Sequence, residues 1–264
     1  GAVNKITSLI EQYGKEIRIV TASSGNHGMA CALAARNLGV QANVVVPVST
    51  PQIKKDSIRA LGANLVEVGA TYDESFLSAC ELAEKEQLYY VHPTSDRYTV
   101  GGQGTISLEL LDQCPQVEQI LVPIGGGGLI TGIALTMKTL KPSVRIYGVM
   151  PEGSAVYVES RRQGRLVTLE HCASMADAVV RKTGEEYLYP YIEKYVDDIL
   201  TVTEDGIRQA VRTACLYGKL TLEGSGALAL AALLEKKCPL NPGTVLICSG
   251  GNIDKAVLDL CMQT

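Results

Sequence analysis

The sequence predicts an α/β fold built on mostly parallel sheet. Short runs rich in β-branched residues alternate along the chain with longer amphipathic segments, which is the pattern of strands joined by crossover helices. The chain has 264 residues, of which 46% are hydrophobic, enough to bury the core of one or two domains. Because no linker or low-complexity tract interrupts the sequence, we expect any second domain to arise by exchange of chain within one compact body.

The expected strands are short apolar runs bounded by turn residues, as buried parallel strands usually are. In order they are Ile17–Thr21, Ala42–Pro47, Asn64–Val68, Leu88–Val91, Gln119–Val122, Val144–Val149, Asp198–Val202 and Thr244–Ser249. Helices are expected between these strands, which supports a parallel arrangement.

Three helices have clear ends. They are Asn26–Leu38, Pro51–Leu61, which opens with proline in its first turn, and Thr203–Tyr217, which opens with the good cap T-E-D. Each is expected to end or turn at a glycine, namely Gly39, Gly62 and Gly218. The first helix is expected to place Met29, Leu33, Ala34 and Leu38 on one face.

Charge and cysteine content exclude several classes of partner. The 24 basic and 28 acidic residues give a net charge of −4 without a basic stripe, so neither a nucleic acid nor an anionic membrane is expected as a ligand. The eight cysteines form no C-x-x-C pair and have no histidines at zinc-ligand spacing, which indicates a reduced, cytoplasmic protein. No signal peptide or membrane-spanning run occurs, so small molecules are the expected partners.

The first candidate site follows the strand that ends at Thr21. It reads Ser23-Ser24-Gly25-Asn26-His27-Gly28 and opens a helix, where hydroxyl, amide and imidazole groups can donate to a carboxylate near the positive helix end. Such residues also cap helices routinely. The residues alone therefore leave carboxylate binding and simple capping about equally open.

The second candidate site is a run of glycines, Gly125-Gly126-Gly127-Gly128-Leu129, before the apolar helix Ile130–Leu140. Four consecutive glycines leave their N–H groups unobstructed at a helix N-terminus, which suits a phosphate group. No lysine follows as in a Walker loop, and the dinucleotide pattern G-x-G-x-x-G is absent, so a phosphate is expected and a nucleotide is not. A flexible turn is a poor alternative, because ordering four glycines is entropically unfavourable.

The third candidate site, Cys248-Ser249-Gly250-Gly251-Asn252, again follows an apolar strand. Ser249 could offer a hydroxyl to a ligand, and the glycines permit close approach. A Ser-Gly-Gly turn is common, so this loop is weak evidence by itself. The run Glu223-Gly224-Ser225-Gly226-Ala227 precedes it.

Four runs occur in this order along the chain: S-S-G-N-H-G, G-G-G-G-L, E-G-S-G-A and S-G-G-N. Together they resemble the serine/threonine dehydratase and serine racemase family. These are fold-type-II pyridoxal-phosphate enzymes, similar to the tryptophan synthase β subunit. The resemblance covers essentially the whole chain and implies two open, mostly parallel sheets flanked by helices. It places residues 1–17 and 97–264 in a large cofactor domain and 18–96 in a small substrate-side domain. A homodimer or homotetramer is also expected.

The resemblance implies roles for individual residues. The implied cofactor is pyridoxal 5'-phosphate. Asn26 would bond its ring hydroxyl, Ser249 would face its pyridine nitrogen, and Glu223 would lie in the same site. Its phosphate would be held by Gly125, Gly126, Gly127, Gly128 and Leu129. For the substrate, Ser23, Ser24, Gly25 and His27 would lie near the carboxylate, and Ser24 would be the catalytic residue that matches the racemases' second acid/base. Cysteine and threonine synthases usually carry threonine in place of His27, so the dehydratase and racemase branch fits better.

Two departures from the family pattern carry expectations. The family's Schiff-base lysine lies in S-F-K-x-R-G-A, whose last two residues match Gly1 and Ala2, so the lysine is expected in an N-terminal segment upstream of Gly1. Some relatives place a metal-binding glutamate directly before the proline matched by Pro151, where this chain has Met150. Because a thioether does not replace a hard oxygen ligand, no metal site is expected there.

The implied activity is a lyase reaction. The cofactor would make the substrate's Cα proton removable, the β-hydroxyl would leave, and hydrolysis would give a 2-oxo acid and ammonia. The expected substrate is L-threonine, L-serine or a related 3-hydroxy amino acid. Two alternatives remain open: a serine racemase-type isomerase, which shares these loops, and an inactive paralogue that binds the cofactor.

Overall fold

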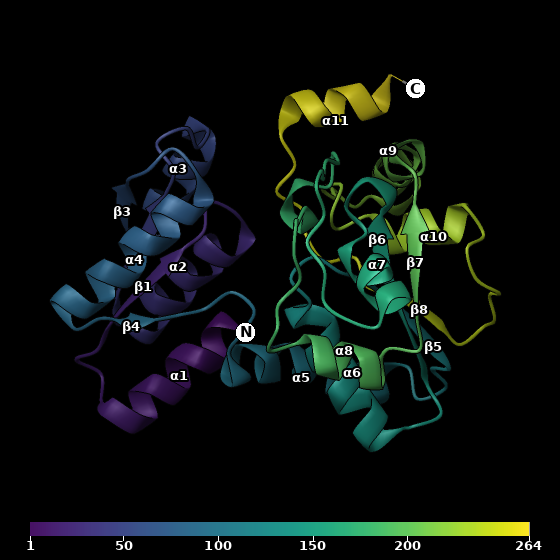
Figure 1. The fold of residues 1–264 in the computed structure, drawn as a ribbon, viewed down its shortest axis with the longest axis horizontal. Helices are drawn as coiled ribbons and strands as arrows, with labels where there is room; N and C mark the ends of the chain where they lie inside the picture. Colours follow the sequence, from purple (N-terminus) through teal and green to yellow (C-terminus); the bar gives the residue numbers. More distant parts are fainter. Residues whose placement is uncertain (264) are drawn as a thin grey trace. The chain divides into compact units, whose positions relative to one another are not determined.

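The computed structural model describes residues 1–263, and Thr264, the last residue of the predicted large domain, lies outside the described residues. The chain divides into two compact units, the first spanning Gly1–Gly102 and the second beginning at Gln103. The described residues form two parallel sheets of four strands, one in each unit, with helices against them (Figure 1). The predicted α/β fold with two parallel sheets is therefore confirmed.

The first unit is coloured purple and blue in Figure 1, and its strands lie in the order β3-β2-β1-β4. The strands are β1 (Arg18–Ala22), β2 (Gln41–Val46), β3 (Asn64–Glu67) and β4 (Tyr89–Tyr90). The helices are α1 (Ala2–Tyr13), α2 (Asn26–Leu38), α3 (Gln52–Ala60) and α4 (Tyr72–Glu86), and α5 (Arg97–Gln113) begins in this unit and continues into the second. Every strand pairing in this sheet is parallel.

The sheet of the first unit is buried on both faces, because alternate residues of a strand point to opposite sides. Ile19 and Val44 belong to a core cluster with Ile6 of α1 and Cys31 of α2. The side chains next along the same strands, Val20 and Val45, belong to a second cluster with Ala79 of α4. This packing fixes the register of the strands and therefore the position of the loop that follows β1.

The second unit repeats the arrangement with the order β7-β6-β5-β8. Its strands are β5 (Gln119–Pro123), β6 (Arg145–Pro151), β7 (Asp198–Val202) and β8 (Thr244–Leu246). Its helices are α6 (Gly128–Leu140), α7 (Val156–Gln163), α8 (Tyr189–Tyr195), α9 (Glu204–Thr213), α10 (Leu228–Leu234) and α11 (Lys255–Met262), with short turns η1 (Glu152–Ser154), η2 (Asp177–Val179) and η3 (Ala214–Gly218). The loops after β5 and β8 leave neighbouring strands at the same edge of this sheet.

Two helix predictions were wrong in detail. Leu33, predicted on the buried face of α2, is 39% exposed, whereas Cys31, Ala32 and Ala35 are buried. Small residues allow α2 to pack closely against α1 and the sheet, so they face the core in place of the larger leucine.

The third predicted helix continues beyond α9 as a π-helical turn, and the left-handed residue after it is Lys219, with φ 54°, and not Gly218. Gly39 and Gly62 do have left-handed φ values of 74° and 93°.

The N-terminal helix belongs to the first compact unit. Ala2, Ile6 and Leu9 of α1 are buried in a cluster with residues of α2 and β1. The predicted large domain included residues 1–17 together with 97–264, so it differs from the division into compact units at this helix. The boundaries of the functional domains stay a prediction.

Within residues 1–263, no helix combines the length and the apolar character needed to cross a membrane. The same residues contain no group of three or more His, Cys, Asp or Glu side chains arranged to hold a metal ion. Met150 is a fully buried core residue of β6. The expectation that no metal binds beside it stays a prediction.

Candidate functional site

The glycine loop connects β5 to α6 and presents backbone donors. The first hydrogen bond inside the helix runs from the N–H of Thr131 to the carbonyl of Gly127 at 3.0 Å. The N–H groups of Gly127, Gly128, Leu129 and Ile130 therefore lack an acceptor within the helix, as the first four of any helix do. They lie at its positive end, and the loop itself carries no acidic side chain. This donor set fits a phosphate group.

Two of the glycines are required by packing behind the loop. A Cβ atom on Gly125 would lie 2.9 Å from Cα of Val179, and one on Gly127 would lie 2.7 Å from Cδ1 of Ile192. Gly127 also has a left-handed φ of 96° and is the N-cap of α6. All four glycines are predicted to hold the phosphate, but at positions 125 and 127 packing also requires glycine, because a side chain there would enter the protein interior.

Tyr157 of α7 holds the glycine loop from behind. Its hydroxyl donates to the carbonyl of Gly126 at 2.9 Å and accepts from the N–H of Glu185 at 2.9 Å. The side chain is fully buried, and burial raises the pKa of its phenol to about 12, so the hydroxyl remains a donor at neutral pH. Sequence reasoning missed this residue, because V-Y-V-E-S belongs to an ordinary helix without a motif.

The loops that contain Glu223 and Ser249 interlock. The N–H of Glu223 donates to the carbonyl of Gly250 at 3.0 Å, and the Glu223 carboxylate accepts from the N–H of Asn252 at 3.1 Å. A Cβ on Gly226 would overlap the same Gly250 carbonyl. The structure therefore brings two of the predicted cofactor residues together, with Glu223 buried and Ser249 exposed. The predicted strand Thr244–Ser249 ends earlier, so Ser249 lies in this loop.

The loop that follows β1 is built around its backbone. Ser23 Oγ accepts from the N–H of Gly25 at 3.3 Å, and the N–H of Ser23 donates to the carbonyl of Val45 at 3.1 Å. The N-cap of α2 is Gly25, so neither Ser24 nor Asn26 occupies the capping position. The alternative that these two residues merely cap the helix is therefore wrong. Ser23, Ser24, Asn26 and His27 are all partly exposed.

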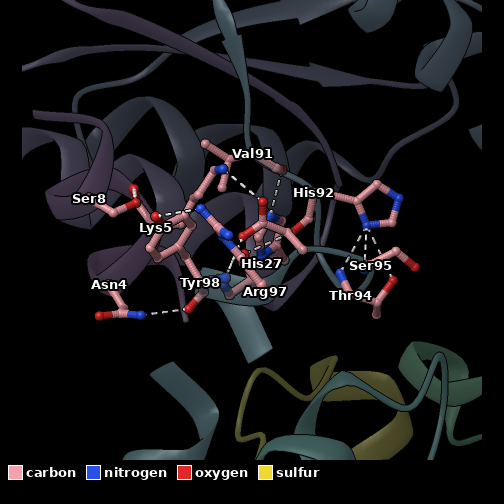
Figure 2. Close-up of polar contacts among 12 residues, drawn as sticks. Asn4, Lys5, Ser8, His27, Val91, His92, Thr94, Ser95, Arg97 and Tyr98 are labelled. Atoms are coloured by element: carbon pink, nitrogen blue, oxygen red, sulfur yellow. Dashed lines mark hydrogen bonds and ion pairs between the residues drawn. The ribbon is translucent and has the colours of Figure 1, made fainter. Parts of the chain in front are cut away.

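His27 is held neutral by its surroundings. Its Nε2 atom lies 3.1 Å from the carbonyl oxygen of Val91, which can only accept, so Nε2 carries the proton and Nδ1 is left as an acceptor (Figure 2). Burial, opposed by this hydrogen bond, lowers the pKa of the ring to about 4. The side chain is thus an uncharged group at neutral pH.

The neutral His27 predicts a pH dependence of stability. An unfolded chain has the ordinary pKa of about 6.5, so between pH 6.5 and 4 the unfolded state binds the additional proton and the folded state does not. Stability is therefore expected to fall as the pH falls through this window, by roughly 2 to 3 kcal/mol. Urea unfolding from pH 7 to pH 4 should show a smaller loss for His27→Gln, and equal losses in both proteins would contradict the assignment.

A second histidine and an ion pair organise the start of α5 (Figure 2). Nδ1 of His92 accepts from the N–H groups of Thr94 and Ser95 at 3.1 and 2.8 Å, which shapes the turn. Lys5 of α1 pairs with Asp96 at 2.7 Å. The ion pair ties α1 to the residue that precedes α5 within the first unit. The sequence offered no motif for the Lys5 contact.

The predicted site residues fall into two groups. Ser23, Ser24, Gly25, Asn26 and His27 share one loop of the first unit, and Gly125, Gly126, Gly127, Gly128, Leu129, Glu223 and Ser249 lie in loops of the second. The loops after β1, β5 and β8 follow the carboxyl ends of parallel strands, where open α/β sheets bind ligands, whereas the Glu223 loop follows η3.

Comparisons with known proteins agree with this architecture. A family model described as "Pyridoxal-phosphate dependent enzyme" matches residues 1–250. The L-threonine ammonia-lyase of Thermotoga maritima is 37% identical over 259 residues, which are 98% of this chain and 64% of that protein. The chain thus spans less than two thirds of that relative.

Solved structures are similar over nearly the whole chain. The processed form of threonine deaminase isoform 2 from Solanum lycopersicum superposes with a TM-score of 0.92 and 37% identity, covering 99% of this chain and 77% of that one. Maize serine racemase superposes with a TM-score of 0.90 and 34% identity, covering 99% and 81%.

Proposed function

Because this chain belongs to the pyridoxal-phosphate-dependent enzyme family, we propose that the whole protein deaminates L-threonine or L-serine by elimination of the β-hydroxyl. The hydroxyl leaves as water, and the later addition of water releases ammonia and leaves a 2-oxo acid. The observation that carries the proposal is the row of backbone donors at the start of α6 that have no acceptor within the helix, backed by packed side chains. The identity to the Thermotoga ammonia-lyase supports the reaction type.

The second unit supplies all but one of the cofactor residues in this proposal. When bound, pyridoxal phosphate supplies the electron sink that makes the substrate's Cα–H bond acidic. The N–H groups of Gly127, Gly128 and Leu129 bind its phosphate, together with the rest of the glycine loop. Ser249 faces the pyridine nitrogen, and Glu223 keeps the Ser249 loop in place by accepting from Asn252.

The first unit supplies the substrate residues and one cofactor residue. Asn26 bonds the ring hydroxyl. Ser23 and Ser24 donate hydrogen bonds to the substrate carboxylate, Gly25 lies beside it, and Ser24 is the second acid/base. Neutral His27 is held by Val91 and supports this loop without adding a charge. Because the His27 ring is uncharged, the loop binds the substrate carboxylate through hydrogen bonds and not through a positive charge on this side chain.

The compartment and assembly are part of the proposal. We assign the protein to the cytoplasm, which is supported by the eight cysteines, all free within residues 1–263. We also propose a homodimer or homotetramer, since Tyr187 and Tyr191 form an exposed aromatic pair of the kind enriched at interfaces. Light scattering of the purified protein tests the assembly.

A racemase remains the second candidate function, because maize serine racemase is 34% identical over nearly all of this chain. Both candidates are tested with protein expressed from the complete reading frame and reconstituted with pyridoxal phosphate. L-threonine and L-serine turnover is followed by 2-oxo acid formation and by chiral analysis. Ammonia and 2-oxo acid in equal amounts are expected. Formation of D-serine as the main product would favour the racemase, and absence of any turnover with bound cofactor would favour an inactive paralogue.

A further inference from the structure

We propose that Tyr157 is a positioning residue that aims the N–H of Gly127 at the cofactor phosphate. The inference rests on the proposed function of the glycine loop. Its basis is one peptide group, the one between Gly126 and Gly127, whose carbonyl accepts a hydrogen bond from the buried Tyr157 hydroxyl at 2.9 Å.

Because a peptide group is planar, this hydrogen bond also fixes the direction of the Gly127 N–H on the other side of the loop. The carbonyl of residue 126 and the N–H of residue 127 belong to the same planar unit, and in a trans peptide they point in opposite directions. All peptides among residues 1–263 are trans. A Gly126 carbonyl that points at Tyr157 therefore directs the Gly127 N–H away from the interior.

The direction of the Tyr157 hydrogen bond is itself determined. The N–H of Glu185 donates to the phenol oxygen at 2.9 Å, and the Gly126 carbonyl can only accept. The phenol must then donate its single proton to Gly126. The ring cannot turn away, because it is buried, stacks on Tyr189 with centroids 6.5 Å apart, and fills the space left by Gly184, whose Cβ would lie 2.7 Å from it.

Glycines give the loop the freedom that this contact removes. A peptide between two glycines can flip with little steric hindrance, which would turn the Gly127 N–H inward and the Gly126 carbonyl outward. An outward carbonyl would repel a phosphate. Tyr157 therefore selects the one orientation of this peptide that binds an anion.

The test compares ligands with and without the phosphate. In Tyr157→Phe, which keeps the ring and loses the hydroxyl, the Kd for pyridoxal phosphate is expected to rise about tenfold, the effect of one hydrogen bond. The Kd for pyridoxal, which has no phosphate, should change less than about twofold. Tyr189→Phe is the matched control, because its hydroxyl bonds Ser160 and not the loop. It should leave both affinities unchanged.

The outcomes separate this inference from the proposed function. Equal weakening of both ligands in Tyr157→Phe, or no change in either, would overturn the role of Tyr157 while the wild-type site stands. Failure of the wild-type protein to bind pyridoxal phosphate would overturn both.

A second measurement needs no variant. In wild-type protein labelled with ¹⁵N-glycine, inorganic phosphate is expected to shift the Gly127 amide signal. Phosphate that shifts other loop glycines and leaves Gly127 unmoved would also overturn the proposal.

Discussion

Replacing Gly127 with alanine is expected to raise the Kd for pyridoxal phosphate at least about 100-fold and to lower the free energy of unfolding by about 3 kcal/mol. The residue has φ 96°, where alanine costs roughly 1 to 2 kcal/mol. The added Cβ would also lie 2.7 Å from Cδ1 of Ile192, inside a packed interior. Relief of this overlap must displace the N-cap of α6 and with it the backbone donors. Cofactor titration and urea unfolding measure the two effects.

A matched control separates backbone strain from the clash. Gly164 has a similar left-handed φ of 65°, but beyond its immediate chain neighbours no heavy atom of the described residues lies within 4 Å of its Cβ position. Gly164→Ala should therefore lose only the strain energy and bind the cofactor normally. Ile192→Val removes the clashing methyl group and should restore part of the affinity of Gly127→Ala. Normal cofactor binding by Gly127→Ala itself would contradict the structure of this loop.

Gly28→Ala is expected to have the second largest effect, a loss of about 3 kcal/mol of stability together with most of the catalytic activity. A Cβ on Gly28 would overlap the carbonyl oxygen of Ser23 and lie 3.1 Å from Cγ1 of Val44. A backbone carbonyl cannot move aside as a flexible side chain can, so the loop and the first turn of α2 must separate. This exceeds the roughly 0.5 to 1 kcal/mol that alanine gains over glycine in a helix.

Gly25→Ala is the control within the same loop. Gly25 has extended backbone with φ −111°, and apart from its chain neighbours no heavy atom among residues 1–263 lies within 4 Å of its Cβ position. The substitution should change the free energy of unfolding by less than about 0.5 kcal/mol. Urea unfolding of the three proteins measures the difference, and equal stability of the two variants would show that the Ser23 carbonyl does not limit Gly28.

The strands were predicted well because their signal is local. Each buried parallel strand is a short apolar run that ends at turn residues, and Asp198–Val202 coincides with β7. The ends of the other strands differ by one to a few residues, because ladder pairing with a neighbour decides where a strand stops. Contacts between elements also decide which polar side chains are buried. Lys55 lies in the mostly polar helix α3, yet it is 7% exposed and donates to Glu67 of β3 at 2.7 Å.

The face that a helix buries was harder to predict. Periodicity placed Leu33 in the core of α2, but α2 packs on α1 and the sheet through its small residues. Which face of a helix turns toward the core depends on how closely the neighbouring helices and strands approach it. A single helix sequence does not contain that distance.

The sequence by itself predicted the candidate site loops, because runs of glycines, hydroxyls and amides are local features, and the resemblance of these loops to a known family indicated the cofactor. Tertiary structure alone decided how the glycine loop is supported. Tyr157 lies 31 residues beyond Gly126, and Val179 and Ile192 lie further along the chain. Such residues meet the loop only when β5, α7 and α8 pack together, since burial and hydrogen bonding between distant segments are not encoded in any one motif.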